Sequence, residues 1–264
     1  MDLQLRDKTA LVTGSTAGIG LAIAELLARE GATVAINGRT EERVTQAIQT
    51  IQTKVPEAKL FALVGDVSNS NKINTILNEL PTVDILINNV GIYDTKPFCD
   101  ITDDEWQQVF DVNVMSGIRL SRHYLRSMLE QNWGRIIFIS SESGIQIPTE
   151  MIHYGMTKTA QIAIARGIAE SVSGTNVTVN SVLPGPTRSE GVETFIQHLS
   201  TERKQDVGEF EKEFFKTMRA SSLLQRFITP EEIASMVVFL SSPLAAATNG
   251  AAIRVEGGIV RSII

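Results

Sequence analysis

Short runs rich in β-branched residues alternate with longer stretches of helical periodicity along the whole 264-residue chain. Most of the short runs are continuously apolar, which is typical of strands in a parallel sheet that is covered on both faces. Regular alternation of strand and helix predicts an α/β protein: a doubly wound, mostly parallel, seven-stranded sheet with helices on both faces. The expected strands span residues 9–14, 33–37, 60–65, 84–89, 135–141, 177–183 and 252–258.

Helical periodicity places helices between these strands, and two of the helix starts carry capping signals. Thr102 stands three residues before Glu105, and Thr229 is followed by a proline and two glutamates, the pattern of a capping box. No repeat, low-complexity tract or linker divides the chain, so residues 1–264 are expected to form one domain. The expected helices span residues 18–30, 41–54, 70–79, 103–131, 151–173 and 230–241.

The stretch from residue 187 to residue 226 interrupts this alternation. It is charged, yet it holds two amphipathic patterns, which indicate two helices packed on the surface. Alternatively, the stretch is a lid, because long insertions after the carboxyl end of a strand often cover a ligand cleft. The first pattern consists of Val192, Phe195, Ile196 and Leu199, and the second of Phe210, Phe214, Phe215 and Met218.

Charge and cysteine content exclude several classes of function. The formal net charge of −6 comes without the basic stripe of a nucleic-acid-binding protein. Cys99 is the only cysteine, so we expect neither a disulfide framework nor a metal site. The first residues lack a secretory signal, and the apolar run at 233–240 is too short to span a membrane. A cytoplasmic protein without membrane partners is therefore expected.

The glycine-rich stretch Thr13–Gly20 directly follows the first expected strand and opens the first helix. Gly14 permits a tight turn, Gly18 lets the backbone approach a phosphate, and Gly20 lets the helix pack closely on the strand. The helix start then offers free N–H groups to a pyrophosphate. Plain turns also use glycine, but this position favours dinucleotide binding in a Rossmann-like fold.

The end of the second expected strand indicates which dinucleotide is bound. A carboxylate there would bind the ribose hydroxyl of NAD, whereas an arginine suits the phosphate of NADP. The strand ends in Asn37, Gly38 and Arg39, and no carboxylate appears before Glu41. Asn37 and Gly38 leave room, and the Arg39 guanidinium is a preferred phosphate partner. NADP(H) is therefore the expected cofactor, with NAD(H) possible.

Several motifs in a fixed order now resemble the short-chain dehydrogenase/reductase family, in its compact single-domain branch, over nearly the whole chain. Thr13–Gly20 is similar to its cofactor loop, and Gly65-Asp66-Val67 is similar to the turn that holds adenine. Asn88-Asn89-Val90-Gly91 departs from the family only in having valine for alanine. Four more matching stretches are "DVNV" with Asn113, "ISSESG" with Ser141, "YGMTK" with Tyr154 and Lys158, and "LPGPT" at 183–187.

The resemblance implies an oxidoreductase that transfers a hydride between NADP(H) and a carbonyl or secondary alcohol. It also implies a set of residues that contact the cofactor. These residues are Gly14, Ser15, Thr16, Gly18, Ile19, Gly20, Arg39, Asp66, Val67, Asn89, Val90, Gly91, Tyr154, Lys158, Pro184, Gly185 and Thr187.

The expected chemistry centres on Tyr154, the general acid in reduction and the general base in oxidation. Lys158 lies four residues later on the same helical face, so we expect its charge to lower the pKa of the phenol. Ser141 is expected to hydrogen-bond the substrate oxygen, whereas alternation along the strand turns Ser140 to the other face. The resemblance alone implies that Asn113 holds a water that connects Lys158 to solvent.

The edge of the substrate pocket is expected to be mostly apolar, with a carboxylate that disfavours anionic substrates. The helix after Tyr154 is rich in small residues, which favours contact with a second subunit in a homodimer or homotetramer. The alternative function is a regulatory protein that binds the cofactor without catalysis, but the catalytic side chains are all present. The expected substrate residues are Ile92, Tyr93, Glu142, Ile147 and Met151.

Overall fold

Seven parallel strands form the sheet of this protein. Our computed structural model describes residues 1–70, 72–190, 192–193 and 206–263. The strand order is β3-β2-β1-β4-β5-β6-β7, which confirms the predicted doubly wound sheet. The strands are β1 (Thr9–Val12), β2 (Thr33–Gly38), β3 (Lys59–Val64), β4 (Ile85–Asn88), β5 (Gly134–Ile139), β6 (Val177–Pro184) and β7 (Ala252–Val255).

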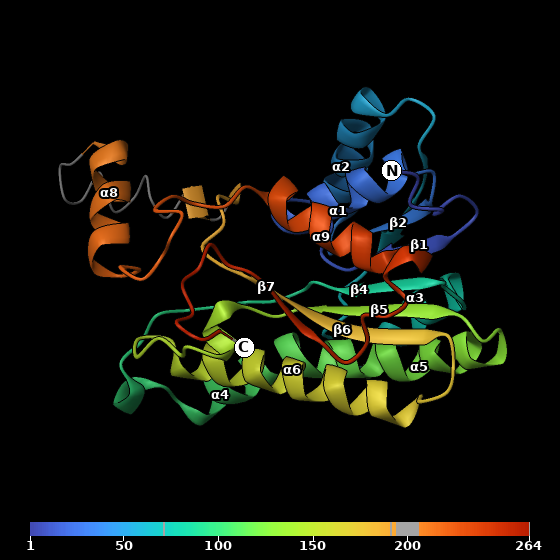
Figure 1. Ribbon diagram of the computed structural model, residues 1–264. Helices are drawn as coiled ribbons and strands as arrows, with labels where there is room; N and C mark the ends of the chain where they lie inside the picture. The colour runs from blue at the N-terminus through green and yellow to red at the C-terminus, as the bar shows by residue number, and fades with distance from the viewer. Residues whose placement is uncertain (71, 191, 194–205, 264) are drawn as a thin grey trace.

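Helices cover both faces of this sheet (Figure 1). One face carries α1 (Gly18–Arg29), α2 (Glu41–Lys54) and α9 (Pro230–Ser241). The other face carries α3 (Ile73–Glu79), α5 (Ser116–Glu130) and α6 (Ile152–Ser171).

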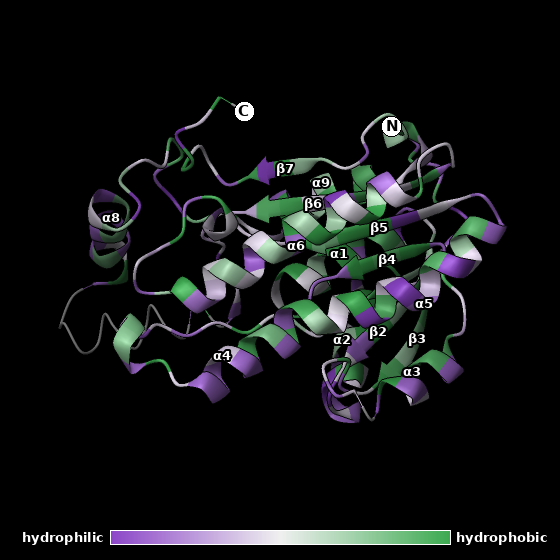
Figure 2. Ribbon diagram, turned by 90° about the horizontal axis from the view of Figure 1, so that it is seen from below, coloured by the Kyte–Doolittle hydropathy of each residue, from purple (hydrophilic) through white to green (hydrophobic). Residues whose placement is uncertain are grey.

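The inner strand β5 shows why four consecutive residues, Ile136–Ile139, are apolar. Ile137 and Ile139 pack into the core under α1 and α9, whereas Ile136 and Phe138 pack into the core on the side of α5 and α6. In Figure 2 the central strands are accordingly hydrophobic, while α4 (Asp103–Phe110) and α5 mix hydrophobic and hydrophilic residues. Burial on both faces explains the lack of alternation.

The stretch predicted as one helix over 103–131 is helical without a break from residue 103 to residue 130, but one turn in it is not α-helical. A π-helical segment, Asp111–Met115, lies between α4 and α5. One extra residue in the turn changes the direction in which the following side chains point, and such bulges are frequent at functional sites. The predicted capping boxes at Thr102 and Thr229 are both present.

The second amphipathic pattern of the insertion forms α8 (Val207–Thr217). This helix lies beyond one end of the sheet, apart from the two helical layers (Figure 1). Its Phe210 and Phe215 pack with Phe227 in a small separate cluster. The first pattern cannot be compared in the same way, because Phe195, Ile196 and Leu199 lie outside the described residues.

Among the described residues, no helix combines the length and the apolar character needed to cross a membrane. Because all strands run in the same direction, their carboxyl ends meet at one edge of the sheet. In open α/β sheets, ligands bind in the crevice at this edge.

Candidate active site

Asn37 holds the glycine loop against the end of β2. Its side-chain oxygen accepts a hydrogen bond from the Gly14 N–H (3.2 Å). Its backbone N–H donates to the Ser15 hydroxyl, and its carbonyl accepts from the Ser15 N–H (2.9 Å each). The side-chain amide of Asn37 donates to the carbonyl oxygens of Leu63 (2.9 Å) and Gly65 (3.1 Å). Asn37 is therefore a buried connector of three segments, and it also lines the polar cavity beside the glycine loop.

Gly20 lies where α1 meets the glycine loop. A Cβ atom at this position would lie 2.4 Å from the Gly14 carbonyl oxygen and 2.6 Å from the Asn89 amide nitrogen. The same Asn89 amide donates to the carbonyl oxygens of Thr13 (2.9 Å) and Gly14 (3.2 Å). The loop conformation itself needs glycine at positions 14 and 18, whose φ angles are +61° and +54°.

A polar cavity of about 580 Å³ opens beside this loop. Asp66 is fixed at its edge because its Oδ1 accepts bonds from the backbone N–H (2.9 Å) and the hydroxyl (2.6 Å) of Ser68. The predicted cofactor residues that line the cavity are Gly14, Thr16, Arg39, Asp66, Val67, Asn89, Val90 and Gly91. The lining residues that sequence reasoning missed include Thr40, Arg43, Ser68, Gln108 and Val112.

A second cavity of about 380 Å³ adjoins the first, since Asn89 and Gly91 line both. Its lining includes Ser141, Tyr154 and Lys158. Further predicted cofactor residues at this cavity are Ile19, Pro184, Gly185 and Thr187. The structure thus brings the predicted phosphate end and the predicted reaction centre together at one edge of the sheet. Ser15, Gly18 and Gly20 instead shape the loop.

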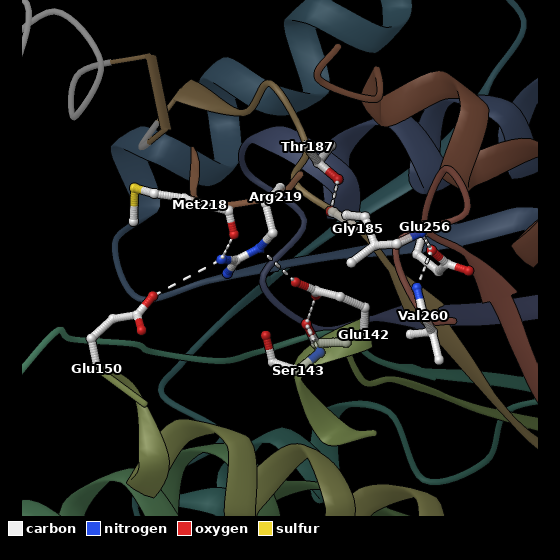
Figure 3. Close-up of polar contacts among 11 residues, drawn as sticks. Glu142, Ser143, Glu150, Gly185, Thr187, Met218, Arg219, Glu256 and Val260 are labelled. Carbon is white, nitrogen blue, oxygen red and sulfur yellow. Dashed lines mark hydrogen bonds and ion pairs between the residues drawn. The ribbon is translucent and has the colours of Figure 1, made fainter. Parts of the chain in front are cut away.

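The segment after β6 is fixed by its backbone. The Gly185 N–H donates to the Val255 carbonyl (3.1 Å), and the Thr187 hydroxyl donates to the Gly185 carbonyl (2.8 Å; Figure 3). A Cβ atom on Gly185 would lie 2.7 Å from the Glu256 carbonyl oxygen. This segment therefore forms a rigid wall of the second cavity.

Ser141 caps the short 3₁₀ helix Glu142–Gly144 that follows β5. Its Oγ accepts a bond from the Ser143 N–H (3.1 Å) and donates to Oε2 of Glu142 (2.5 Å). Ser140 points the other way, as the strand alternation predicts, because its hydroxyl donates to the Lys158 carbonyl (2.8 Å). Ser140 thus anchors α6, and Ser141 faces the cavity.

Burial controls the protonation of Tyr154 and Lys158. It lowers the pKa of Lys158 to about 7. The pKa of Tyr154 is raised, first by burial and then by the Glu142 carboxylate, while a hydrogen bond with Ser141 acts in the opposite direction.

The expectation that Lys158 lowers the pKa of Tyr154 is wrong for this structure, in which the pKa of the phenol is raised and Lys158 is not among the causes of the shift. The Lys158 amine donates to the Ile139 carbonyl (2.9 Å), and it lies 5.4 Å from the centre of the Tyr154 ring. With a pKa near 7 it is also only partly charged at neutral pH. Tyr154 keeps its proton, which is the state that a general acid needs.

Asn113 lies in the π-helical segment, where its side chain joins two other segments. Its side-chain oxygen accepts from the Ile92 N–H (2.7 Å), and its amide donates to the Ile92 carbonyl (2.9 Å) and the Thr157 hydroxyl (3.0 Å). Its own carbonyl accepts a bond from Gln161 (2.6 Å). Thr157 and Gln161 were missed because only the fold brings them to Asn113. The water that Asn113 is expected to hold stays a prediction.

Three of the five predicted substrate residues, Tyr93, Glu142 and Met151, line the second cavity. The Tyr93 ring meets Tyr154 edge-on at 6.0 Å between centroids. Ile92 lines the polar cavity instead, and Ile147 lines a neighbouring hollow. Phe210, Phe214 and Met218 of the second amphipathic pattern also line this cavity, and the lining residues that were missed include Glu150 and Arg219. In the described part of the chain, no cluster of metal-ligating side chains is present.

The lowered pKa of Lys158 makes a prediction for stability. Between about 7 and the ordinary value of 10.5, the unfolded chain binds more protons than the folded chain, so stability should rise with pH by up to about 1.4 kcal/mol per unit. Lys158→Met removes this contribution. Urea unfolding at several pH values should show the wild type gaining stability relative to the variant as pH rises through this range. A constant difference would contradict the prediction.

Comparison with known proteins agrees with this geometry. Residues 8–200 match the sequence profile of the short chain dehydrogenases. The chain is 52% identical over 263 residues to the uncharacterized oxidoreductase YvaG of Bacillus subtilis, with 100% of both chains covered. It is 33% identical over 262 residues to the 3-oxoacyl-(acyl-carrier-protein) reductase FabG of Aquifex aeolicus, covering 98% of this chain and 100% of that one.

Among solved structures, L-sorbose reductase from Gluconobacter frateurii, complexed with NADPH and L-sorbose, superposes with a TM-score of 0.94. The two chains are 28% identical, and the match covers 100% of both. The present chain therefore belongs to the short-chain dehydrogenase/reductase family. It is an NAD(P)-dependent oxidoreductase that acts on CH–OH or C=O groups.

Proposed function

We propose that this protein reduces neutral carbonyl compounds, and oxidises the corresponding secondary alcohols, with NADP(H). The observation that carries the proposal is the position of Ser141, Tyr154 and Lys158 in a cavity that shares Asn89 and Gly91 with the polar cavity at the glycine loop. One elongated ligand could occupy both cavities and present one end to Tyr154. The reduction of L-sorbose by a solved NADPH-bound relative supports the same class of reaction.

Each catalytic side chain has a role that its surroundings support. Bound NADPH supplies the hydride, and the protein orients and polarises the carbonyl. Tyr154, whose raised pKa keeps it protonated, donates its proton to the oxygen of the carbonyl as negative charge develops there. Ser141 can donate a hydrogen bond to the same oxygen. Lys158, with a pKa near 7, can return a proton to Tyr154 at neutral pH.

The residues at the end of β2 support NADP(H) over NAD(H). Arg39 and Arg43 both line the polar cavity, and the first carboxylate after β2 is Glu41 in the first turn of α2. Arg43 also forms an ion pair with Glu190 (3.2 Å), which leaves Arg39 as the stronger candidate for the phosphate. Planar guanidinium groups suit phosphate oxygens particularly well.

Arg39→Asp should shift the cofactor preference toward NADH. The change removes a phosphate partner and adds a repulsive charge, so the ratio of kcat/KM for NADPH to that for NADH should fall about 10- to 100-fold. Lys59→Asp is the control, because it changes the net charge equally at an exposed position at the start of β3. An unchanged ratio in Arg39→Asp would show that Arg39 does not bind the phosphate.

An NADPH-oxidation assay over neutral ketones, with NADH in parallel, tests the proposed function directly. Tight NADPH binding without turnover of any carbonyl would favour the regulatory alternative. Assembly into a homodimer or homotetramer, the role of residues 187–226 as a lid and a cytoplasmic location stay predictions from the sequence.

A further inference from the structure

The proton of the Ser141 hydroxyl is engaged by Glu142. A serine hydroxyl has one proton to donate, and in this structure it is directed to Oε2 of Glu142 at 2.5 Å. One acceptor position of the same oxygen is occupied by the Ser143 N–H. The Ser141 hydroxyl therefore has to turn away from Oε2 of Glu142 before it can donate to a substrate oxygen.

Glu142 is held in this position by Arg219, which follows α8. The Arg219 Nε lies 3.4 Å from Oε1 of Glu142, and its Nη1 lies 3.9 Å from Oε1 of Glu150. Nη1 also donates to the Met218 carbonyl (2.9 Å). Figure 3 shows the guanidinium between the two carboxylates. Because Arg219 occupies one oxygen of Glu142, the other oxygen faces Ser141.

The charges of this cluster restrict the substrate. Glu142 and Glu150 bring two negative charges to the wall of the second cavity, and Arg219 brings one positive charge. The side chains of Glu142 and Arg219 are only 6% and 14% exposed, so water screens them poorly. A carboxylate or phosphate on the substrate would be repelled here, whereas a hydroxyl group could donate to Glu142.

We propose that the site selects α-hydroxy carbonyl compounds, whose hydroxyl donates to Oε2 of Glu142 while the adjacent carbonyl oxygen accepts from Ser141. The proposal rests on the proposed function and names its substrate class. The close approach of Oε2 to the Ser141 hydroxyl matches two oxygen atoms on neighbouring carbons. Arg219 is a positioning residue in this arrangement.

The substrate hydroxyl thus releases the Ser141 proton for the carbonyl. In the reduction, the C=O π bond breaks, the hydride from NADPH forms a C–H bond and the proton from Tyr154 forms the new O–H bond. NADPH is oxidised and the ketone is reduced to a vicinal diol. The hydroxyl on the neighbouring carbon makes and breaks only hydrogen bonds. The aromatic and methionine side chains of Phe210, Phe214 and Met218 border the rest of the cavity.

The test compares acetoin, an α-hydroxy ketone, with butanone, which has the same carbon chain without the hydroxyl, and with the anion 2-oxobutyrate. The wild type should prefer acetoin over butanone in kcat/KM by about 10- to 100-fold, which corresponds to one hydrogen bond to a charged group. It should reduce 2-oxobutyrate more slowly than butanone.

Glu142→Gln should bring the acetoin-to-butanone ratio close to one, because the acceptor of the substrate hydroxyl loses its negative charge. Arg219→Gln should reduce the same ratio, and Arg219→Lys should restore part of it. Arg226→Gln is the control, because this exposed arginine of the same segment pairs with Glu232, and it should keep the wild-type ratio.

Two outcomes would overturn the proposal about Glu142. The wild type could reduce acetoin and butanone equally well, or Glu142→Gln could lower both by the same factor. Either result would leave the proposed carbonyl reductase function intact. A protein that turns over none of the three compounds with NADPH or NADH, and none in a broader ketone panel, would contradict both proposals.

Discussion

The Tyr154→Phe variant should bind NADPH as the wild type does and reduce ketones about 100- to 10,000-fold more slowly, the usual contribution of a general acid. Phenylalanine keeps the ring and its contact with Tyr93, so the cavity should keep its shape. Only the hydroxyl that donates the proton is lost. Steady-state kinetics and NADPH fluorescence titration measure the two parts of this prediction separately.

Tyr124→Phe is the matched control for that experiment. Tyr124 is fully buried on α5, and its hydroxyl donates to the Leu80 carbonyl (2.9 Å). Its removal should lower the free energy of unfolding by about 1 kcal/mol and leave turnover unchanged. Wild-type turnover in Tyr154→Phe, or equal losses in the two variants, would refute the assignment of Tyr154 as the acid.

Gly20→Ala should weaken NADPH binding about 10- to 100-fold, the equivalent of the 1–3 kcal/mol that overpacking usually costs. The added methyl group would lie 2.4 Å from a backbone oxygen of the glycine loop, and backbone cannot turn aside as a flexible side chain can. The loop must therefore move away from α1, with Asn89. The dissociation constant for NADPH, measured by calorimetry, tests this.

Gly167→Ala makes the same chemical change on another helix. Among the described residues, nothing lies within 4 Å of the Cβ that it would add. Alanine should therefore stabilise α6 by about 0.5–1 kcal/mol without changing cofactor affinity. If Gly20→Ala binds NADPH as tightly as Gly167→Ala, the close packing at Gly20 does not hold the loop.

The sheet was predictable because its inner strands bury both faces, which makes strands such as β4 and β5 largely apolar runs. The π-helical segment Asp111–Met115 was not, because tertiary contacts of Asn113 with Ile92 and Thr157 stabilise it. Nothing in the local periodicity of residues 103–131 distinguishes this segment from a regular helix.

The sequence also predicts some residues of the candidate site and not others. Tyr154 and Lys158 lie four residues apart on one helix, so their spacing indicates their proximity, and the family resemblance indicated Ser141 as the third member. Arg219 lies far along the chain from Glu142, and only the path of the chain after α8 brings the two together. The direction of the Tyr154 pKa shift could not be predicted from the sequence either, because it depends on burial, which a sequence pattern does not measure.

The buried connector Asn37 limits how the cofactor preference of this protein can be redesigned. An aspartate at this position would direct carboxylate oxygens toward the carbonyls of Leu63 and Gly65, which now accept bonds from the asparagine amide. Repulsion between these acceptors would disturb the turn that the redesign needs. A change of nicotinamide specificity therefore has to begin at the solvent-facing Arg39, on the outer side of the turn, with the asparagine kept in place.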